Sequence, residues 1–501
     1  MSVLNYDFSI LFSVGSIVAL LAGALIGMLV GALPGLGPTV GCALVVPITY
    51  TMEPTQAVLL LISLYMSSEY GGSISSIVLG VPGTAAAVAT EIDGNALAKQ
   101  GYPGKSLAYS LYASTTGGFI SCLILMFLTI PLMQVTIKFA DPELFLIAML
   151  GLVSIVTLGS EDAAKSVVSV AFGMLLTSIG LDMLSGTQRY TFGSTSLMDG
   201  ISLVPLLTGL FAISEVLNMA CGDLGKQTVN HKENLRVSLS FKEYSKHILL
   251  IVKSALIGTF AGIVPGMGAS PAAWLSYTEA KRSSKTPELF GKGNPEGIVA
   301  PESANNACVG GALVPLLTLG IPGSSTIAVV SSALIMQGIQ PGPNLLNQNL
   351  DLVYSVFWGL LVATVMMFLI GKYTTTLFAS LLVIPNYVLA TIIFTISLIG
   401  AYAARRMMMD VWIAIIAGVV GFFMKKLKYS TPAFVLAFVL GSMIERNFRR
   451  ALMLSRGSYM IFVNRPLALC CLLLNVLMIG SILLRKYRER KARRMSVDNV
   501  G

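Results

Sequence analysis

The nine residues Leu33–Gly41 read LPGLGPTVG and place a Pro-Gly break inside a long apolar segment. A related break, VPGMGASPA, occupies Val264–Ala272, which lies 231 residues further along the chain. Two more landmarks recur in the same order at offsets of 239 and 240 residues, which indicates an internal duplication, since a single Pro-Gly pair punctuates many loops. These landmarks are Gly71-Gly72 with Gly310-Gly311, and LGVPGT at Leu79–Thr84 with LGIPGS at Leu319–Ser324.

The composition around these breaks is that of a membrane protein. Only 11% of the 501 residues are charged, against about 25% in a soluble domain, and 55% are hydrophobic, which excludes a soluble enzyme. We therefore predict an all-α polytopic membrane protein with about 12 transmembrane segments. The apolar spans are 9–32, 55–80, 107–137, 143–159, 163–186, 201–219, 247–263, 303–320, 352–371, 376–403, 408–424, 430–444 and 459–484.

The longest hydrophilic segment, 222–246, separates the two copies. It contains or borders both histidines, His231 and His247, but no third ligand has metal-binding spacing, so we interpret it as a solvated cytoplasmic linker. Most of the net charge of +9 lies between Arg485 and Arg494, which is typical of a cytoplasmic anchor rather than of nucleic-acid binding. The predicted organisation is a first repeat with extra helices (1–221), the linker (222–246), a second repeat core (247–350), C-terminal membrane helices (351–484) and a basic cytoplasmic tail (485–501).

Basic residues flank the two copies on opposite sides. In the first copy Tyr50–Gln56 holds no Lys or Arg, whereas Glu91–Ser106 holds two lysines. In the second copy Lys281–Lys292 is basic, and Gln340–Asp351 holds no basic residue. Because Lys and Arg mark the cytoplasmic side of a membrane, this pattern predicts two inverted repeats with a solute site near the midplane, where the copies meet.

Each copy is expected to contain a broken or re-entrant hairpin. The linker end and Lys281–Lys292 are both basic, so the apolar chain between them should return to the side that it entered from, with Pro265–Gly268 at the tip. A mirror-related tip is expected at Pro34–Gly37. The topology of 372–458 stays open, because simple alternation cannot place all of its basic clusters inside; a short hairpin around Pro432 is one solution.

Every Pro-Gly break is followed by a resumed helix that begins with small or hydroxyl-bearing residues. A helix start exposes unpaired N–H groups and the positive end of the helix dipole, worth about 0.3–2 kcal/mol to an anion. Four such starts can bind a carboxylate without a buried arginine; the alternative is that Gly and Pro only kink and pack helices. The predicted substrate-binding residues are Pro34, Gly35, Gly37, Thr39, Gly72, Ser73, Pro82, Gly83, Thr84, Pro265, Gly266, Gly268, Ser270, Pro322, Gly323, Ser324 and Ser325.

A second polar group lies in the almost uncharged stretch Ala300–Gly311, APESANNACVGG. An acid at the centre of a membrane helix costs about 2.5–3.5 kcal/mol, so Glu302 with Asn305 and Asn306 suggests ion coupling. The two amides can coordinate Na⁺, and Glu302 can instead carry a coupling proton; hydrogen bonding between helices is the alternative for the amides. Glu69, at a comparable place in the first copy, is interpreted as a second cation ligand, a titrating group or a residue at the aqueous edge.

Other chemistry is not indicated by the sequence. It contains no Ser-His-Asp set, no phosphate-binding GxxxxGK[ST] loop and no metal-ligand spacing, so we predict neither an enzyme nor a cofactor beyond the coupling ion, Na⁺ or H⁺. Asp93, at the start of a basic loop, is expected to be solvated or to cap a helix, and Asp182 can pair with Arg189.

Several long motifs resemble one family, the large membrane subunit of the bacterial tripartite tricarboxylate transporters (TctA-like). They are LPGLGPTVG, EYGGSISSIVLGVPGTAAAVATEIDGNALAKQGYPGKSLA, GLDMLSGTQRYTFG, FGKGNPEGIVAPESANNA and LTLGIPGSS. The resemblance is specific from about Gly31 to Pro343 and weaker to about Pro466. One departure is Ser67, Ser68 and Glu69, where the family usually has small or apolar residues; a carboxylate there opposes a highly charged tricarboxylate unless it is protonated or cation-bound.

The resemblance implies a translocating subunit in the bacterial inner membrane. Its expected partners are an organic carboxylate such as citrate, a small membrane subunit and a periplasmic solute-binding protein, with an ion gradient as the energy source. It implies no nucleic-acid partner. Two other hypotheses stay open: a stand-alone carboxylate carrier or channel without a binding protein, and an intramembrane enzyme. The absence of membrane-embedded histidine and of HExxH-type spacing argues against the enzyme, since His247 lies at the edge of its span.

Overall fold

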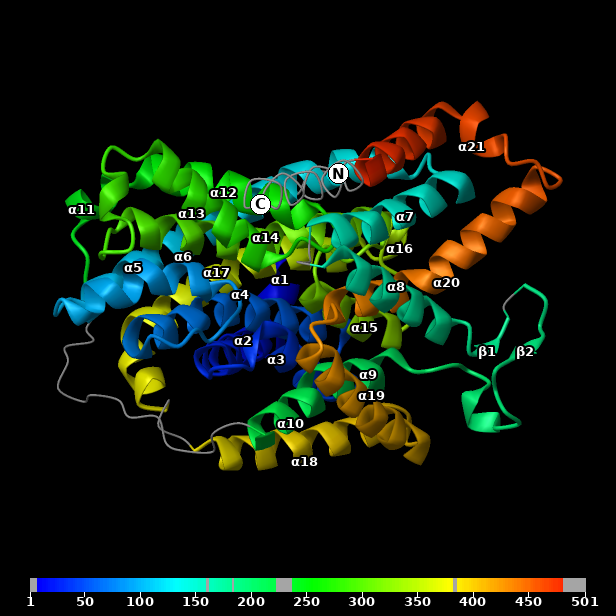
Figure 1. The fold of residues 1–501 in the computed structure, drawn as a ribbon, viewed down its shortest axis with the longest axis horizontal. Helices are drawn as coiled ribbons and strands as arrows, with labels where there is room; N and C mark the ends of the chain where they lie inside the picture. The colour runs from blue at the N-terminus through cyan, green and yellow to red at the C-terminus, as the bar shows by residue number, and fades with distance from the viewer. Residues whose placement is uncertain (1–6, 159–161, 183, 222–236, 382–384, 481–501) are drawn as a thin grey trace, which may run out of the picture.

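The computed structural model describes residues 7–158, 162–182, 184–221, 237–381 and 385–480, and the described chain is almost entirely helical (Figure 1). The basic tail 485–501 and most of the linker, 222–236, lie outside the described residues. The first copy contributes α2 (Val14–Ala32), α3 (Gly37–Thr49), α4 (Pro54–Leu79) and α5 (Ala87–Lys99). The second copy contributes α12 (Ile248–Ile263), α13 (Ala269–Ser283), α14 (Glu296–Leu319) and α15 (Ser325–Met336).

Further helices follow each copy. After the first copy come α6 (Pro103–Thr136), α7 (Asp141–Leu158), α8 (Ala163–Thr177), α9 (Leu203–Leu207), the π-helical turn η3 (Thr208–Ile213) and α10 (Ser214–Cys221). After the second come α17 (Leu350–Leu381), α18 (Asn386–Arg405), α19 (Met408–Lys426), α20 (Thr431–Leu454) and the helical stretch Pro466–Gly480. Short pieces complete the chain: α1 (Phe8–Leu11), α11 (Phe241–Ser245), α16 (Leu345–Gln348), α21 (Ile461–Asn464), the 3-10 turns η2 (Thr195–Leu197) and η4 (Pro287–Leu289), and the strands β1 (Gly180–Leu181) and β2 (Gln188–Arg189).

The duplication is visible in matched close contacts between helices. In the first copy α2 packs so tightly on α4 that a Cβ added at Gly27 would lie 2.2 Å from the Leu64 carbonyl oxygen. In the second copy α12 packs on α14 in the same way, and a Cβ added at Gly258 would lie 2.1 Å from the Ala304 carbonyl oxygen. Gly258 follows Gly27 by 231 residues and Ala304 follows Leu64 by 240. The offsets of 231 and 240 residues found in the sequence therefore also relate the residues of this helix contact.

Gly258→Ala is expected to destabilise the fold strongly, because the new methyl group overlaps a backbone oxygen that cannot move aside. Overpacking of this kind costs about 1–3 kcal/mol or more. The check is the apparent melting temperature of the purified protein in detergent, with Gly480→Ala as the matched control, since a Cβ at Gly480 meets no neighbouring atom among the described residues. Equal melting temperatures for the two variants would contradict the packing described.

The structure corrects one register in the predicted duplication. Gly71 packs against the Met28 carbonyl oxygen, and the residue that makes the equivalent contact, with the Thr259 carbonyl oxygen, is Gly311. Gly71 therefore corresponds to Gly311 and not to Gly310, so the offset is 240 here as it is at the second Pro-Gly break. Helices α4 and α14, and the breaks that follow them, are thus related by the same offset of 240 residues.

The two copies are inverted, as the charge pattern predicted. The side chain of Gln337, beyond the end of α15, donates to the carbonyl oxygens of Thr49 (2.8 Å) and Met52 (3.2 Å), so α15 and α3 end together. At the other end Gln100, beyond α5, donates to the Lys292 carbonyl oxygen at 2.8 Å, which joins α5 to the basic loop after α13. Because α3 and α13 are equivalent helices that run to opposite ends, one copy is upside down relative to the other. In Figure 1, α5, α11 and α13 lie toward the left, and the strands lie at the right.

The long helices that follow each copy pack on the other copy. Helix α6 lies along α14, and α17 lies along α4. A Cβ added at Gly117 of α6 would lie 2.2 Å from the Ser303 carbonyl oxygen of α14, so this crossing is also backbone-close. Because α6 and α17 each pack on the opposite copy, the two copies form one core, which is the arrangement expected for a pair of inverted repeats.

The predicted count of about twelve spans is not confirmed, since seven described helices are long and apolar enough to cross a membrane, beside shorter apolar helices. The span 163–186 was too long: α8 ends at Thr177, and the chain turns into the β1–β2 hairpin. The predicted break near 372–375 is also wrong, because α17 continues to Leu381. The hydroxyls of Thr374 and Thr375 donate to the carbonyl oxygens of Ile370 and Gly371, so these polar side chains are satisfied within the helix and do not require it to end.

The predicted pairing of Asp182 with Arg189 is part of a larger ion cluster. Asp182 accepts from Arg449 at 2.8 Å and lies 3.8 Å from Arg189, and Arg189 in turn donates to Glu445 at 2.8 Å. Hydrogen bonds from Ser185, the Leu184 N–H and Arg449 hold the pKa of Asp182 well below its ordinary value. The cluster fastens the β1–β2 hairpin to the far end of α20.

Candidate functional site

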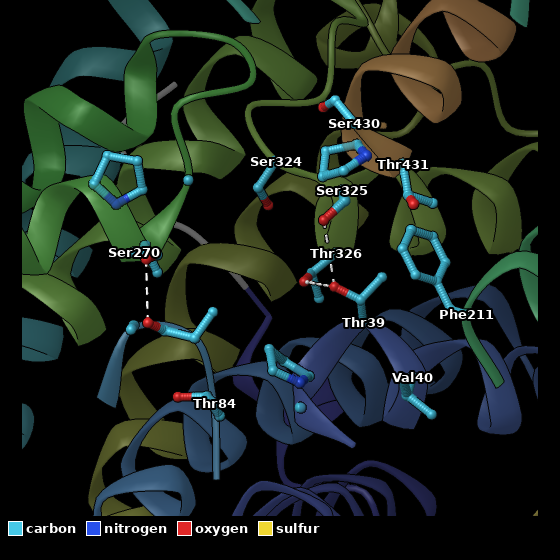
Figure 2. Close-up of a pocket in the computed structure, with 18 of the residues that line it drawn as sticks. Thr39, Val40, Thr84, Phe211, Ser270, Ser324, Ser325, Thr326, Ser430 and Thr431 are labelled. Carbon is cyan, nitrogen blue, oxygen red and sulfur yellow. Dashed lines mark hydrogen bonds between the residues drawn. The ribbon is translucent and has the colours of Figure 1, made fainter. Parts of the chain in front are cut away.

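All four Pro-Gly breaks open onto one cavity of about 840 Å³ (Figure 2). Its lining includes 35–40 and 82–86 of the first copy, and 266–271 and 324–326 of the second. The predicted residues that line it are Gly35, Gly37, Thr39, Pro82, Gly83, Thr84, Gly266, Gly268, Ser270, Ser324 and Ser325. Six other predicted residues lie behind the lining: Pro34, Gly72, Ser73, Pro265, Pro322 and Gly323.

Each break meets a break of the opposite copy. The Thr39 hydroxyl oxygen lies 2.8 Å from that of Thr326 and 3.3 Å from that of Ser325, so the start of α3 contacts the start of α15. At the equivalent place, 231 residues later, the Ser270 hydroxyl donates to the Ala85 carbonyl oxygen at 3.1 Å. Figure 2 draws both contacts at the cavity wall. The cavity is therefore built from two related pairs of helix starts.

The four helix starts differ in how their N–H groups are used. The Thr84 hydroxyl accepts from the Ala87 N–H at 3.3 Å, and the Ser324 hydroxyl accepts from the Ile327 N–H at 3.2 Å, so α5 and α15 are partly capped by their own side chains. Among the described residues, no side chain caps the start of α3 or of α13. The backbone donors of α3 and α13 are consequently the ones open to an anionic ligand.

The residues behind the lining hold the breaks in shape. The Gly83 N–H donates to the Gly72 carbonyl oxygen at 3.2 Å, and a Cβ at Gly72 would lie 2.5 Å from the Thr84 hydroxyl oxygen. The Gly266 N–H donates to the Gly323 carbonyl oxygen at 2.9 Å, and the Pro265 carbonyl oxygen accepts from Ser154. Through these contacts Gly72, Pro265 and Gly323 support the cavity wall from behind, and they do not form part of its surface.

Glu69 lines the cavity from α4 and is almost completely buried. Its carboxylate oxygen Oε2 has no hydrogen-bond partner among the described residues, which is costly for a buried polar atom. It is the one acidic residue on the part of the lining that the two repeat cores build.

The amides of Asn305 and Asn306 meet the same stretch of α4. Asn306 donates to the Met66 carbonyl oxygen at 3.0 Å, and Asn305 donates to the Glu69 carbonyl oxygen at 3.3 Å. Both amide NH₂ groups are thus engaged, while both amide oxygens lack a partner in the described chain. Five buried oxygens of this pair of helices have no hydrogen-bond partner within the part of the chain that the structure describes: Ser67 Oγ, Ser68 Oγ, Glu69 Oε2, Asn305 Oδ1 and Asn306 Oδ1.

Glu302 does not join this group, although the sequence placed it beside the two amides. Its carboxylate meets α5 and α6 and accepts from the hydroxyls of Thr90 (2.5 Å), Ser110 (2.9 Å) and Ser114 (2.8 Å). Glu302 is fully buried and is not part of the cavity lining. Three donors satisfy an ionised carboxylate, so its burial is explained without a ligand.

Three lysines that were not predicted as site residues complete the cavity wall. Lys165 comes from the first turn of α8, Lys425 from the last turn of α19, and Lys428 from the turn that leads into α20. A usable signal was present, since Lys165 is a charged residue inside the apolar span 163–186, and ionisable residues in such spans are usually functional.

Comparisons with known proteins agree with this architecture. The chain is 33% identical over 456 residues, 91% of both chains, to the uncharacterized 52.8 kDa protein in the TAR-I ttuC′ 3′ region of Agrobacterium vitis. It is also 33% identical over 234 residues to the uncharacterized protein in the TAR-II ttuC′ 3′ region of the same organism, which covers 47% of this chain and 97% of that one. No solved structure matches the chain significantly. The profile of the Tripartite tricarboxylate transporter TctA family matches residues 17–436, and the chain with its two inverted, Pro-Gly-broken copies belongs to that family.

Proposed function

We propose that this chain is the translocating subunit of an ion-gradient-driven uptake system for an organic carboxylate in the bacterial inner membrane. In this proposal a periplasmic binding protein delivers the solute and a small membrane subunit completes the complex. The observation that carries the proposal is the convergence of four broken helices, two from each inverted copy, on one cavity. Membership of the TctA family supports the same assignment.

The solute carboxylate is proposed to bind at the helix starts. The uncapped starts of α3 and α13 offer backbone N–H groups, and the hydroxyls of Thr39 and Ser270 lie beside them. Each helix start contributes about 0.3–2 kcal/mol to an anion in its first turn. Because the equivalent starts come from opposite copies, a solute between them is contacted by both copies at once.

The coupling ion is proposed to bind between α4 and α14. The free amide oxygens of Asn305 and Asn306, with Glu69 Oε2, are hard oxygen ligands of the kind that Na⁺ prefers. A bound cation there neutralises Glu69, which otherwise repels an anion from the cavity. A proton on Glu69 has the same electrostatic effect, so the coupling ion is Na⁺ or H⁺, and occupancy by the cation favours occupancy by the solute.

Inverted repeats give this site a means of alternating access. Two arrangements related by exchange of the copies have similar energies, and each exposes the cavity to one side of the membrane. The two-fold contact pattern of α3 with α15 and of α13 with α5 supplies the matched pairs of breaks that such an exchange requires. The loaded cavity is thereby carried between two orientations of one scaffold.

The test is uptake of labelled citrate and other labelled carboxylates into vesicles that contain the chain and its small membrane subunit. We expect accumulation above the outside concentration when a Na⁺ or pH gradient and the binding protein are present, and loss of accumulation when the gradient is dissipated. Uptake that only equilibrates would indicate a channel instead. Full uptake without the binding protein would indicate a stand-alone carrier, and turnover of the solute without transport would indicate an enzyme.

A further inference from the structure

The cavity has two walls of different chemistry. The wall built by the Pro-Gly breaks carries no Lys, Arg or His, and its donors are backbone N–H groups and hydroxyls. A second wall is built by the start of α8, the end of α19 and the start of α20, and Figure 2 shows Ser430 and Thr431 of this wall. Every lysine in the described lining lies on that second wall, which we call the basic wall: Lys165, Lys425 and Lys428.

Contacts hold the basic wall together across 262 residues of sequence. The Lys165 ammonium donates to the Leu427 carbonyl oxygen at 2.7 Å and lies 5.6 Å from the centre of the Tyr429 ring. This fixes the start of α8 against the turn between α19 and α20. An ammonium group has three donors, and these contacts occupy one of them. Lys165 is thereby positioned at the cavity with donor capacity left.

Two acids reduce the charge of the basic wall without cancelling it. Asp162 caps α8 by accepting from the N–H groups of Ala164 (2.9 Å) and Lys165 (3.4 Å). Glu215 accepts from Lys425 at 2.5 Å and lies outside the lining. Lys428 is exposed, and no acid among the described residues pairs with it. Three ammonium groups against two carboxylates leave one positive charge on the basic wall.

The ion pair of Lys425 also reaches the first Pro-Gly break. A Cβ added at Gly35 would lie 2.7 Å from the Glu215 carboxylate, so Glu215 rests directly on the tip of the break. The equivalent tip of the second copy has a neutral contact instead, in which Ser154 donates to the Pro265 carbonyl oxygen at 2.9 Å. An anion that reaches Lys425 therefore competes with the contact that holds the first tip.

From this arrangement we infer that the basic wall is a second anion subsite, so that the solute carries at least two carboxylates. One carboxylate binds at the helix starts and the other binds at Lys165 and Lys428, with Lys425 shared between the solute and Glu215. A monocarboxylate satisfies only one wall and leaves the excess positive charge of the other unmatched. The inference rests on the proposed function and deepens it, since it assigns the residues that set the charge of the solute.

The experiment compares uptake of labelled citrate, succinate and propionate by the wild-type complex and by Lys165→Gln and Lys428→Gln. Losing one ammonium-carboxylate contact is expected to raise the KM for succinate and citrate about tenfold in either variant. The KM for propionate should change less than about twofold, because that solute does not reach the basic wall. The matched control is Lys426→Gln, since Lys426 is next to Lys425 but lies over the Phe422 ring outside the lining.

The outcomes separate this inference from the proposed function. A similar rise for all three solutes, an unchanged KM for succinate, or a wild type that prefers propionate would each overturn the second subsite while leaving carboxylate uptake in place. Absence of uptake of any carboxylate by the wild-type complex would instead overturn the proposed function. Protection of the detergent-solubilised protein against heat by citrate, reduced in Lys428→Gln but kept in Lys426→Gln, gives a readout of binding that does not depend on transport.

Discussion

Replacing Asp93 by alanine is expected to lower the free energy of unfolding by about 4 kcal/mol, because it strands several buried donors at once. Asp93 is fully buried on α5, and its Oδ1 accepts from the N–H groups of Gly291 (2.8 Å), Gly293 (3.0 Å) and Asn294 (2.8 Å). Its Oδ2 accepts from the Tyr277 hydroxyl at 3.0 Å. The carboxylate therefore fastens the loop before α14 to the opposite copy.

The three N–H groups converge because Gly291 and Gly293 adopt positive φ angles of 85° and 89°, which curl the loop into an anion-binding nest. Asp93→Asn keeps one acceptor oxygen and should cost less than Asp93→Ala. Glu91→Gln is the matched control, two residues away on α5 and only partly buried. Apparent melting temperatures in detergent check the order; an alanine variant as stable as the Glu91 control would contradict the role assigned to the carboxylate.

The elements that were predicted correctly are those with local signals. Each Pro-Gly break removes helical hydrogen bonds at a fixed place, so the ends of α2 at Ala32 and of α12 at Ile263 follow from the residues themselves. The inversion was readable because membrane insertion leaves a charge asymmetry in the loops, and Gln100 and Gln337 now show which loop ends lie together. The convergence of the breaks followed from duplication and inversion combined.

The elements that were missed depend on partners far away in sequence. The expectation that Asp93 is solvated was wrong, because its donors lie about 200 residues later, and no local pattern reveals a nest in another loop. The role of Lys425 was missed for a similar reason, since a lysine at a helix end is the usual mark of the membrane surface, and only the fold brings it to a cavity. Glu302 was placed beside Asn305 by the i, i+3 spacing, which leaves the two side chains about 60° apart around the helix. Hydroxyls of α5 and α6 hold the Glu302 carboxylate, whereas the Asn305 amide meets α4, and no local pattern reveals these partners.

Replacing Asn305 by alanine is expected to raise the Na⁺ concentration that half-saturates uptake by about 10- to 100-fold, because the coupling cation binds more weakly. The side chain supplies a buried amide oxygen that has no partner in the described chain, so its loss removes a candidate ligand, together with the hydrogen bond that its NH₂ group donates to the Glu69 carbonyl oxygen. The matched control is Asn447→Ala, a buried amide with one polar atom that lacks a partner among the described residues; it lies on α20, which packs on α7 and α8 rather than at the crossing of α4 and α14.

Glu69→Gln separates the two candidate ions. If Na⁺ is coupled, the glutamine variant keeps an oxygen ligand but loses the charge, so uptake should need more Na⁺ at every pH. If H⁺ is coupled, the variant resembles the permanently protonated state, so uptake should lose its dependence on a pH gradient while exchange of internal for external solute persists. Measurement of uptake under a Na⁺ gradient at fixed pH, and under a pH gradient without Na⁺, distinguishes these results.

Glu302→Gln tests whether Glu302 has a structural role or transfers the coupling proton. Three hydroxyl donors hold its carboxylate outside the cavity lining. A structural role predicts lower stability with unchanged ion dependence, since the amide cannot accept from all three donors as a carboxylate does. A role in proton transfer predicts instead that gradient-driven uptake fails while exchange survives.

Full transport with unaltered ion dependence in both Asn305→Ala and Glu69→Gln would remove the crossing of α4 and α14 from the coupling mechanism and leave the cavity as a solute site alone.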